Sequence, residues 1–98
     1  MNEKLLNPRM DDLFRAILAL ETMEECRAFF DDLCTVGELQ AFSQRLQVAK
    51  LLREGRVYSD IAAETGASSA TISRVNRSLA YGSDGYEVIL ERVKHDGE

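Results

Sequence analysis

The stretch YSDIAAETGASSATISRVNRSL, residues 58–79, decides the fold. Its pattern predicts two short helices joined by a tight turn at Gly66, because glycine tolerates the left-handed backbone that ends a helix. We expect Ser59 to cap the first helix and either Ser68 or Ser69 to cap the second. The second helix carries one apolar stripe with helical spacing, formed by Ile72, Val75 and Leu79. The stretch is therefore predicted to be a helix-turn-helix.

The polar faces of the second helix contain no acidic residue. Hydroxyl groups near a helix N-terminus suit phosphate oxygens and base edges, and arginine suits phosphate or a bidentate contact with guanine. A solvated helical hairpin is the alternative, and an acid-free face is unusual in so acidic a chain. We expect the residues that contact DNA to be Ser59, Ser68, Ser69, Ala70, Thr71, Ser73, Arg74 and Arg77.

The net charge of the 98-residue chain, −5, is an objection to DNA binding. Residues 1–55 hold seven basic and ten acidic side chains, and residues 81–98 hold two and five. Residues 56–80 hold three basic and two acidic side chains, so this segment alone is not acidic. We expect modest, salt-sensitive affinity that depends on two copies per site. Further phosphate contacts are expected from Lys50, Arg53 and Arg56, just before the motif.

Start and stop signals predict four further helices and no strand, which makes a single all-α domain over residues 1–98. The third helix is expected to run to about Glu54, and Gly82 is expected to end the fifth. The predicted starts are Asn7 with Pro8, Thr22 with Glu25, Thr35 with Glu38, and Ser83 or Asp84.

Apolar side chains are concentrated in the first half of the chain, which contains all four phenylalanines, Phe14, Phe29, Phe30 and Phe42. This bias predicts that residues 1–55 mainly form a helical dimer interface, with a single intramolecular core as the alternative. On the third helix the predicted inward face is Leu39, Phe42, Leu46, Ala49 and Leu52, widened by Val48 and Leu51. On the last helix, in residues 81–98, it is Tyr86, Ile89, Leu90 and Val93.

Catalytic and metal-binding patterns are missing from the sequence. Cys26 and Cys34 match no zinc or redox spacing, and His95 is the only histidine. No nucleophile stands beside a base, and there is no glycine-rich phosphate loop. We therefore expect no enzyme activity, no metal and no cofactor. Without a signal peptide or a long apolar run, the protein is expected to be cytoplasmic and free of membranes.

A family resemblance covers Leu33 to Val93. It is carried by LCTVGELQAFSQRLQVAKLLREG, residues 33–55, then by residues 58–79 and a closing helix. This order and spacing resembles the Trp repressor family, and the whole chain resembles its YerC/YecD-type branch. The resemblance implies an intertwined homodimer that acts as a transcriptional repressor. Its paired motifs would bind a palindromic operator with half-sites about 34 Å apart.

The resemblance also implies an effector site, carried over as Thr35, Arg45, Arg74 and Ser78. Tryptophan-binding members have glycine where this chain has Val75. Valine adds bulk where the ligand must lie close to the backbone, and native packing leaves little slack. A small-molecule co-repressor therefore remains open, but tryptophan is not expected. For both arginines the alternative is ion pairing with nearby acids.

Residues 61–79 also resemble the DNA-reading headpiece of the Lac repressor family. Those headpieces begin their chains and precede a large sugar-binding domain, whereas this motif comes late. A different alternative is a dimeric protein-interaction module without specific DNA binding, which the acidic balance favours.

Overall fold

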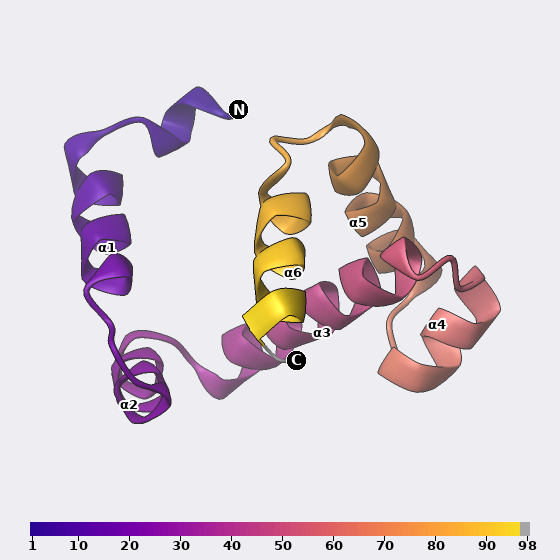
Figure 1. Cartoon of the computed structure of the whole chain (residues 1–98), viewed down its shortest axis with the longest axis horizontal. Coiled ribbons are helices and arrows are strands. Elements are labelled where there is room, and N and C mark those ends of the chain that lie inside the picture. Colours follow the sequence, from indigo (N-terminus) through magenta and orange to yellow (C-terminus); the bar gives the residue numbers. More distant parts are fainter. Residues whose placement is uncertain (97–98) are drawn as a thin grey trace. The chain divides into compact units, whose positions relative to one another are not determined.

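A computed structural model describes residues 1–96, with side chains for residues 1–94, so the side chain of His95 lies outside it. Within these residues there is no strand, and the expected all-α fold is confirmed (Figure 1). A short 3-10 helix, η1 (Glu3–Leu5), precedes the six expected helices. These are α1 (Pro8–Leu18), α2 (Met23–Leu33), α3 (Val36–Arg53), α4 (Tyr58–Thr65), α5 (Ser69–Tyr81) and α6 (Gly85–Asp96).

Two of the predicted helix starts are confirmed by their hydrogen bonds. The Asn7 side chain accepts the Met10 N–H at 3.0 Å, with Pro8 as the first residue of α1. At α3, Thr35 Oγ1 accepts the Glu38 N–H at 3.1 Å, and Glu38 Oε1 accepts the Thr35 N–H at 2.9 Å. The bond from the Thr35 backbone and then that from its hydroxyl lower the pKa of Glu38 below its ordinary value. This reciprocal pair is a complete capping box.

Thr22 is the N-cap of α2 as predicted, and the Glu25 N–H donates to Thr22 Oγ1 at 3.0 Å. The other half of the predicted capping box differs, because the Glu25 carboxylate accepts the Glu21 N–H, not that of Thr22. The prediction that Ser59 caps α4 is wrong, because the N-cap is Val57 and no side chain makes a capping bond. The extended backbone of Val57 lets its carbonyl accept the Ile61 N–H at 3.1 Å, so the helix begins before Ser59.

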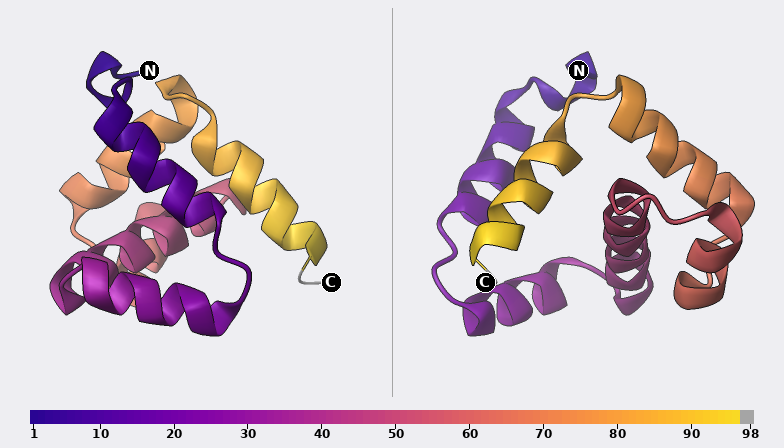
Figure 2. Two further views of the ribbon diagram at one scale, coloured as in Figure 1. Left: turned by 90° about the vertical axis from the view of Figure 1, so that its left-hand side faces the viewer. Right: turned by 45° about the vertical axis from the view of Figure 1, so that its right-hand side comes forward.

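The chain divides into two compact units, Met1–Leu39 and Gln40–Glu98. Every buried side chain of the described residues belongs to the second unit, where α3, α4, α5 and α6 each contribute. Figure 2 shows α3 nearly end-on with α4 beside it. The core consists of Val48, Ala49, Leu51, Ile61, Ala67, Ile72, Val75 and Leu90.

The first unit buries none of its described side chains. Phe29 and Phe30 meet edge to face, with ring centroids 5.6 Å apart, but both are only half-buried. Leu18 is 82% exposed and Met23 is 66% exposed. The apolar stripes of α1 and α2 therefore have no core of their own.

The predicted inward face of α3 is only partly correct. Val48 and Leu51, expected to be marginal, lie in the core, whereas Phe42 is 47% exposed and Leu46 is 40% exposed. On α6, Leu90 is buried as expected, but Ile89 and Val93 are exposed. The reason is that α4 and α5 pack on the side of α3 that carries Val48 and Leu51. The apolar band of α3 is wide enough to leave a second surface uncovered.

Candidate nucleic-acid interface

The turn between α4 and α5 is fixed by backbone conformation and by one side chain. Gly66 has φ of 72°, the left-handed conformation predicted for it, and its N–H donates to the Ala62 carbonyl at 2.9 Å. The Thr65 hydroxyl donates to the Ile61 carbonyl at 2.7 Å and accepts the Ala67 N–H at 3.1 Å. The turn is thus well defined, as positioning of a following recognition helix requires.

Ser68 caps α5, and Ser69 is the first residue within the helix. The Ser68 hydroxyl oxygen accepts the Thr71 N–H at 3.1 Å, and its proton is donated to Thr71 Oγ1 at 3.1 Å. Ser68 has therefore used its hydroxyl proton within the protein. The Thr71 hydroxyl keeps its own proton, which can be donated to a phosphate or base.

The apolar stripe of α5 faces the core and its acid-free polar face is open. Ile72 and Val75 are each 1% exposed, as the spacing predicted. No ion pair within residues 1–94 involves Arg74 or Arg77. The exposed candidates on and around this face are Ser59, Ser68, Ser69, Ala70, Ser73, Arg74 and Arg77, while Thr71 is half-buried.

The acidic groups within the motif are neutralised by Arg56, which lies between α3 and α4. Arg56 pairs with Glu64 at 2.6 Å and Asp60 at 3.8 Å, which are the only two acids in residues 56–80. The hydrogen bond to Glu64 is the largest cause of a raised Arg56 pKa. Uncompensated positive charge in this segment is therefore concentrated on α5, at Arg74 and Arg77.

Arg53 and Arg56 do not fit their expected role as phosphate contacts. Arg53 Nε lies 3.1 Å from Glu87 and its Nη2 lies 3.2 Å from Glu91, which ties α3 to α6. Both arginines thus engage carboxylates of their own chain. For Arg53 the reason is proximity that the sequence alone does not reveal, because α6 follows α3 by more than 30 residues.

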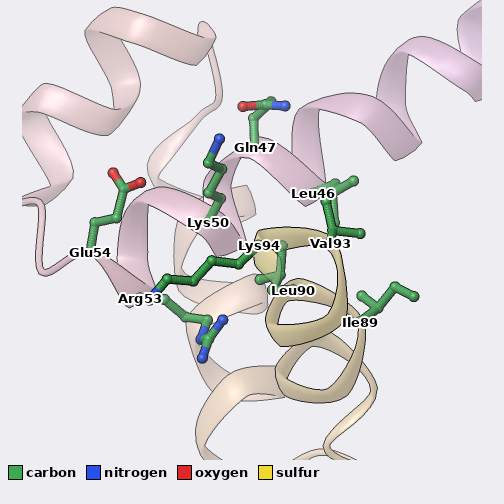
Figure 3. Close-up of a pocket in the computed structure, with 9 residues that line it drawn as sticks. All are labelled: Leu46, Gln47, Lys50, Arg53, Glu54, Ile89, Leu90, Val93 and Lys94. Atoms are coloured by element: carbon green, nitrogen blue, oxygen red, sulfur yellow. The ribbon is translucent and has the colours of Figure 1, made fainter. Parts of the chain in front are cut away.

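A groove of about 400 Å³ lies between α3 and α6 within the second unit (Figure 3). Leu46, Ile89 and Val93 supply apolar lining, and Lys50 and Lys94 stand at its edge. Lys50, expected to contact phosphate, therefore lies beside the apolar lining of this groove.

The four candidate effector residues lie in different settings. The Arg45 guanidinium lies 5.2 Å from the centre of the Phe42 ring, a cation–π contact. Ser78 lines a shallow groove with Leu46 and Tyr86, whereas Arg74 lies on the exposed face of α5. The hydroxyl of Thr35, in the first unit, accepts a capping bond.

Neither candidate effector arginine is ion-paired within residues 1–94, so the alternative of pairing with nearby acids is not supported. Val75 is packed in the core of the second unit. Gln44 was not among the predicted residues, and its amide donates to the Thr65 carbonyl at 3.1 Å. No local signal could have found this bond, because its partners are 21 residues apart.

Among the described residues, no group of three or more His, Cys, Asp or Glu side chains is placed to hold a metal ion. Cys26 and Cys34 are free thiols, both half-buried. No helix in residues 1–96 is long and apolar enough to cross a membrane.

Comparison with known proteins supports the interpretation of α4 and α5 as a helix-turn-helix. Residues 8–94 match the family described as Trp repressor protein. The chain belongs to the Trp repressor family. This is a family of DNA-binding transcription regulators, and the resemblance inferred from residues 33–93 is thereby confirmed.

Relatives of the chain share nearly its whole length. It is 58% identical over 92 residues to the YerC protein of Bacillus subtilis (strain 168), described as uncharacterized; the match covers 94% of this chain and 88% of that protein. A crystal structure of a candidate Trp repressor from Staphylococcus aureus has a TM-score of 0.91 at 56% identity, over 96% and 95% of the two chains. A TrpR-like protein from Eubacterium eligens ATCC 27750 has a TM-score of 0.91 at 55% identity, over 95% and 96%.

Proposed function

We propose that this member of the Trp repressor family is a sequence-specific transcriptional repressor. It binds a palindromic operator as a homodimer, with one helix-turn-helix from each copy in successive major grooves. Such half-sites lie about 34 Å apart on one face of the duplex.

The observation that carries the proposal is the exposed, acid-free face of α5. Its arginines, Arg74 and Arg77, are unpaired among the described residues, while Arg56 holds the nearby acids Asp60 and Glu64. A recognition helix needs this distribution, because phosphate and guanine attract cations and repel carboxylates. Ser69 and Ser73 add short donors that can approach the groove closely.

Dimerisation is supported by what a single chain leaves uncovered. The first unit buries none of its described residues, and the second leaves an apolar surface at Phe42, Leu46, Ile89 and Val93. Contiguous apolar surface of this kind is typical of a protein interface. A chain of about 100 residues also gains from a shared core, because it buries only about 60–65% of its unfolded surface alone.

The proposed effector site keeps the four candidate residues but does not bind tryptophan. Thr35, Arg45, Arg74 and Ser78 are the candidate ligand-contacting residues, and any ligand is a small molecule other than tryptophan. Val75 supports this restriction, because its side chain is 1% exposed and part of the core. Binding of DNA is therefore proposed not to require tryptophan.

Selection of genomic fragments by the purified protein tests the proposal. We expect enriched fragments to form a complex in a mobility-shift assay, with affinity that falls steeply as salt rises. Absence of any salt-sensitive complex with wild-type protein would refute the function.

The replacement Arg77→Ala should weaken binding by about 1–3 kcal/mol if Arg77 contacts a base. Arg92→Ala is the matched control, because Arg92 is an exposed arginine on α6, away from the motif. Equal losses for both variants would assign the effect to net charge rather than to recognition.

A protein-interaction module without specific DNA binding is the second candidate. The observation in its favour is the acidic excess of three charges on each side of residues 56–80. Affinity capture that returns one protein partner and no enriched DNA would favour this candidate over repression.

A further inference from the structure

One side chain of α3 holds the turn of the helix-turn-helix. The Gln44 amide nitrogen donates to the Thr65 carbonyl oxygen at 3.1 Å, and both residues are half-buried. Thr65 is the last residue of α4, so its carbonyl has no partner within that helix. Gln44 therefore acts as a C-terminal cap supplied by a different helix.

The residue that accepts the Gln44 bond, Thr65, lies only a few residues before the start of α5. The Thr65 hydroxyl also bonds the Ile61 carbonyl and the Ala67 N–H, and Ala67 is buried. Ser68, the cap of α5, follows directly. A change at the Gln44 amide thus displaces the turn and the first residues of the candidate recognition helix together.

Gln44 is distinguished from its neighbours on α3. It lies in a polar groove lined also by Gln40, Gln47 and Glu64. Gln40 and Gln47 are exposed and make no side-chain hydrogen bond within the described residues, whereas Gln44 is half-buried and bonded. The groove thus contains one glutamine that joins α3 to the motif and two that do not.

We propose that Gln44 is a positioning residue that sets the orientation of α5 against α3 and so determines specificity for DNA. The inference rests on the proposed function. Specific binding by a dimer requires both recognition helices in register with their half-sites, whereas non-specific binding requires only positive charge near phosphate. Loss of the bond therefore lowers specific affinity and leaves non-specific affinity unchanged.

The test replaces Gln44 with methionine, which matches its length and helix propensity but cannot donate a hydrogen bond. Gln40→Met is the matched control. On a fragment selected by the wild type, Gln44→Met should bind about fivefold more weakly, as loss of one typical hydrogen bond predicts. Its affinity for random-sequence DNA of equal length should match the wild type, at a temperature where all variants are folded.

Hydrogen exchange tests the contact without DNA. Gln44→Met should speed exchange at the Gly66 and Ala67 amides, while the amides of α6 and all sites in Gln40→Met exchange as in the wild type. Unchanged exchange at the turn, or equal loss of affinity for both kinds of DNA, would overturn the positioning role.

A variant that retains the donor covers the case in which Gln44→Met fails to fold. Gln44→Lys keeps an N–H donor and should preserve the ratio of specific to random-sequence affinity; a fivefold drop in that ratio would overturn the proposal. If the wild type selects no fragment, the proposed function fails, and the exchange experiment still decides whether Gln44 holds the turn.

Discussion

Residues 1–39 and residues 40–98 are stabilised in different ways. In the first unit, α1 and α2 both begin at a side-chain cap, yet neither contains a buried residue. In the second, α4 has no side-chain cap, but its Ile61 is 0% exposed. Capping determines where a helix begins, and burial provides most of its stability in a protein. The first unit therefore has capped helices without a buried core.

The largest effect is expected in the core of the second unit. Ile61→Ala removes a fully buried side chain that packs between α4 and the other helices, and should lower the free energy of unfolding by about 3 kcal/mol. Denaturant unfolding followed by circular dichroism measures this. The loss should be the same at low and high protein concentration, because Ile61 lies within one unit. A loss below about 1 kcal/mol would mean that the site is not a tight core.

A somewhat smaller effect is expected on the uncovered surface. Phe42→Ala removes a 47% exposed ring from the apolar side of α3, and should weaken dimerisation by about 2 kcal/mol, or roughly 30-fold. Sedimentation equilibrium measures the change. Tyr81→Ala is the control, because Tyr81 is 87% exposed at the end of α5 and should leave dimerisation unaltered. A Phe42→Ala protein that associates as tightly as the wild type would show that this exposed surface of the second unit is not the dimer interface.

Two glycines should respond in opposite directions. Gly66→Ala places a side chain at φ of 72°, where no neighbour obstructs it, so the cost of about 1–2 kcal/mol is conformational. Gly37→Ala lies in the first helical turn of α3 with ordinary contacts only, and should stabilise by about 0.5–1 kcal/mol. Thermal unfolding of both variants checks the sign. Destabilisation by Gly37→Ala would show that the first turn of α3 is not helical in solution.

The smallest effect concerns the capping box at the start of α3. The Glu38 carboxylate is stabilised by bonds from Thr35, so its folded pKa lies below its unfolded value. Its contribution is present above the unfolded pKa, about 4.3, and is lost as pH falls through the folded pKa. Glu38→Gln should unfold with a weaker dependence on pH below about 4.5 than the wild type, and identical profiles would contradict the assignment.

The sequence allowed prediction of much of the fold but less of its packing. The starts of α1 and α3 follow from local hydrogen-bonding chemistry at Asn7 and Thr35, and the turn follows from Gly66. These signals depend on residues within four positions of each other. The placement of Phe42 at the surface and of Val48 in the core depended on which side of α3 receives α4 and α5.

The candidate site, like the fold, was predictable only in part. The open face of α5 was predictable, because an apolar stripe implies the opposite polar face. The roles of Arg53, Arg56 and Gln44 were not, because their side-chain hydrogen-bond partners are eight to 38 residues away in the chain. The basic side chains just before the motif predicted phosphate contacts at Arg53 and Arg56, but both form ion pairs with carboxylates of the same chain.

The stoichiometry of the complex with DNA tests the central claim most directly. Sedimentation of wild-type protein with a selected genomic fragment should give two chains per duplex, with a steep loss of affinity as salt rises. A complex of one chain per duplex with undiminished affinity would contradict a paired helix-turn-helix built on a shared dimer core.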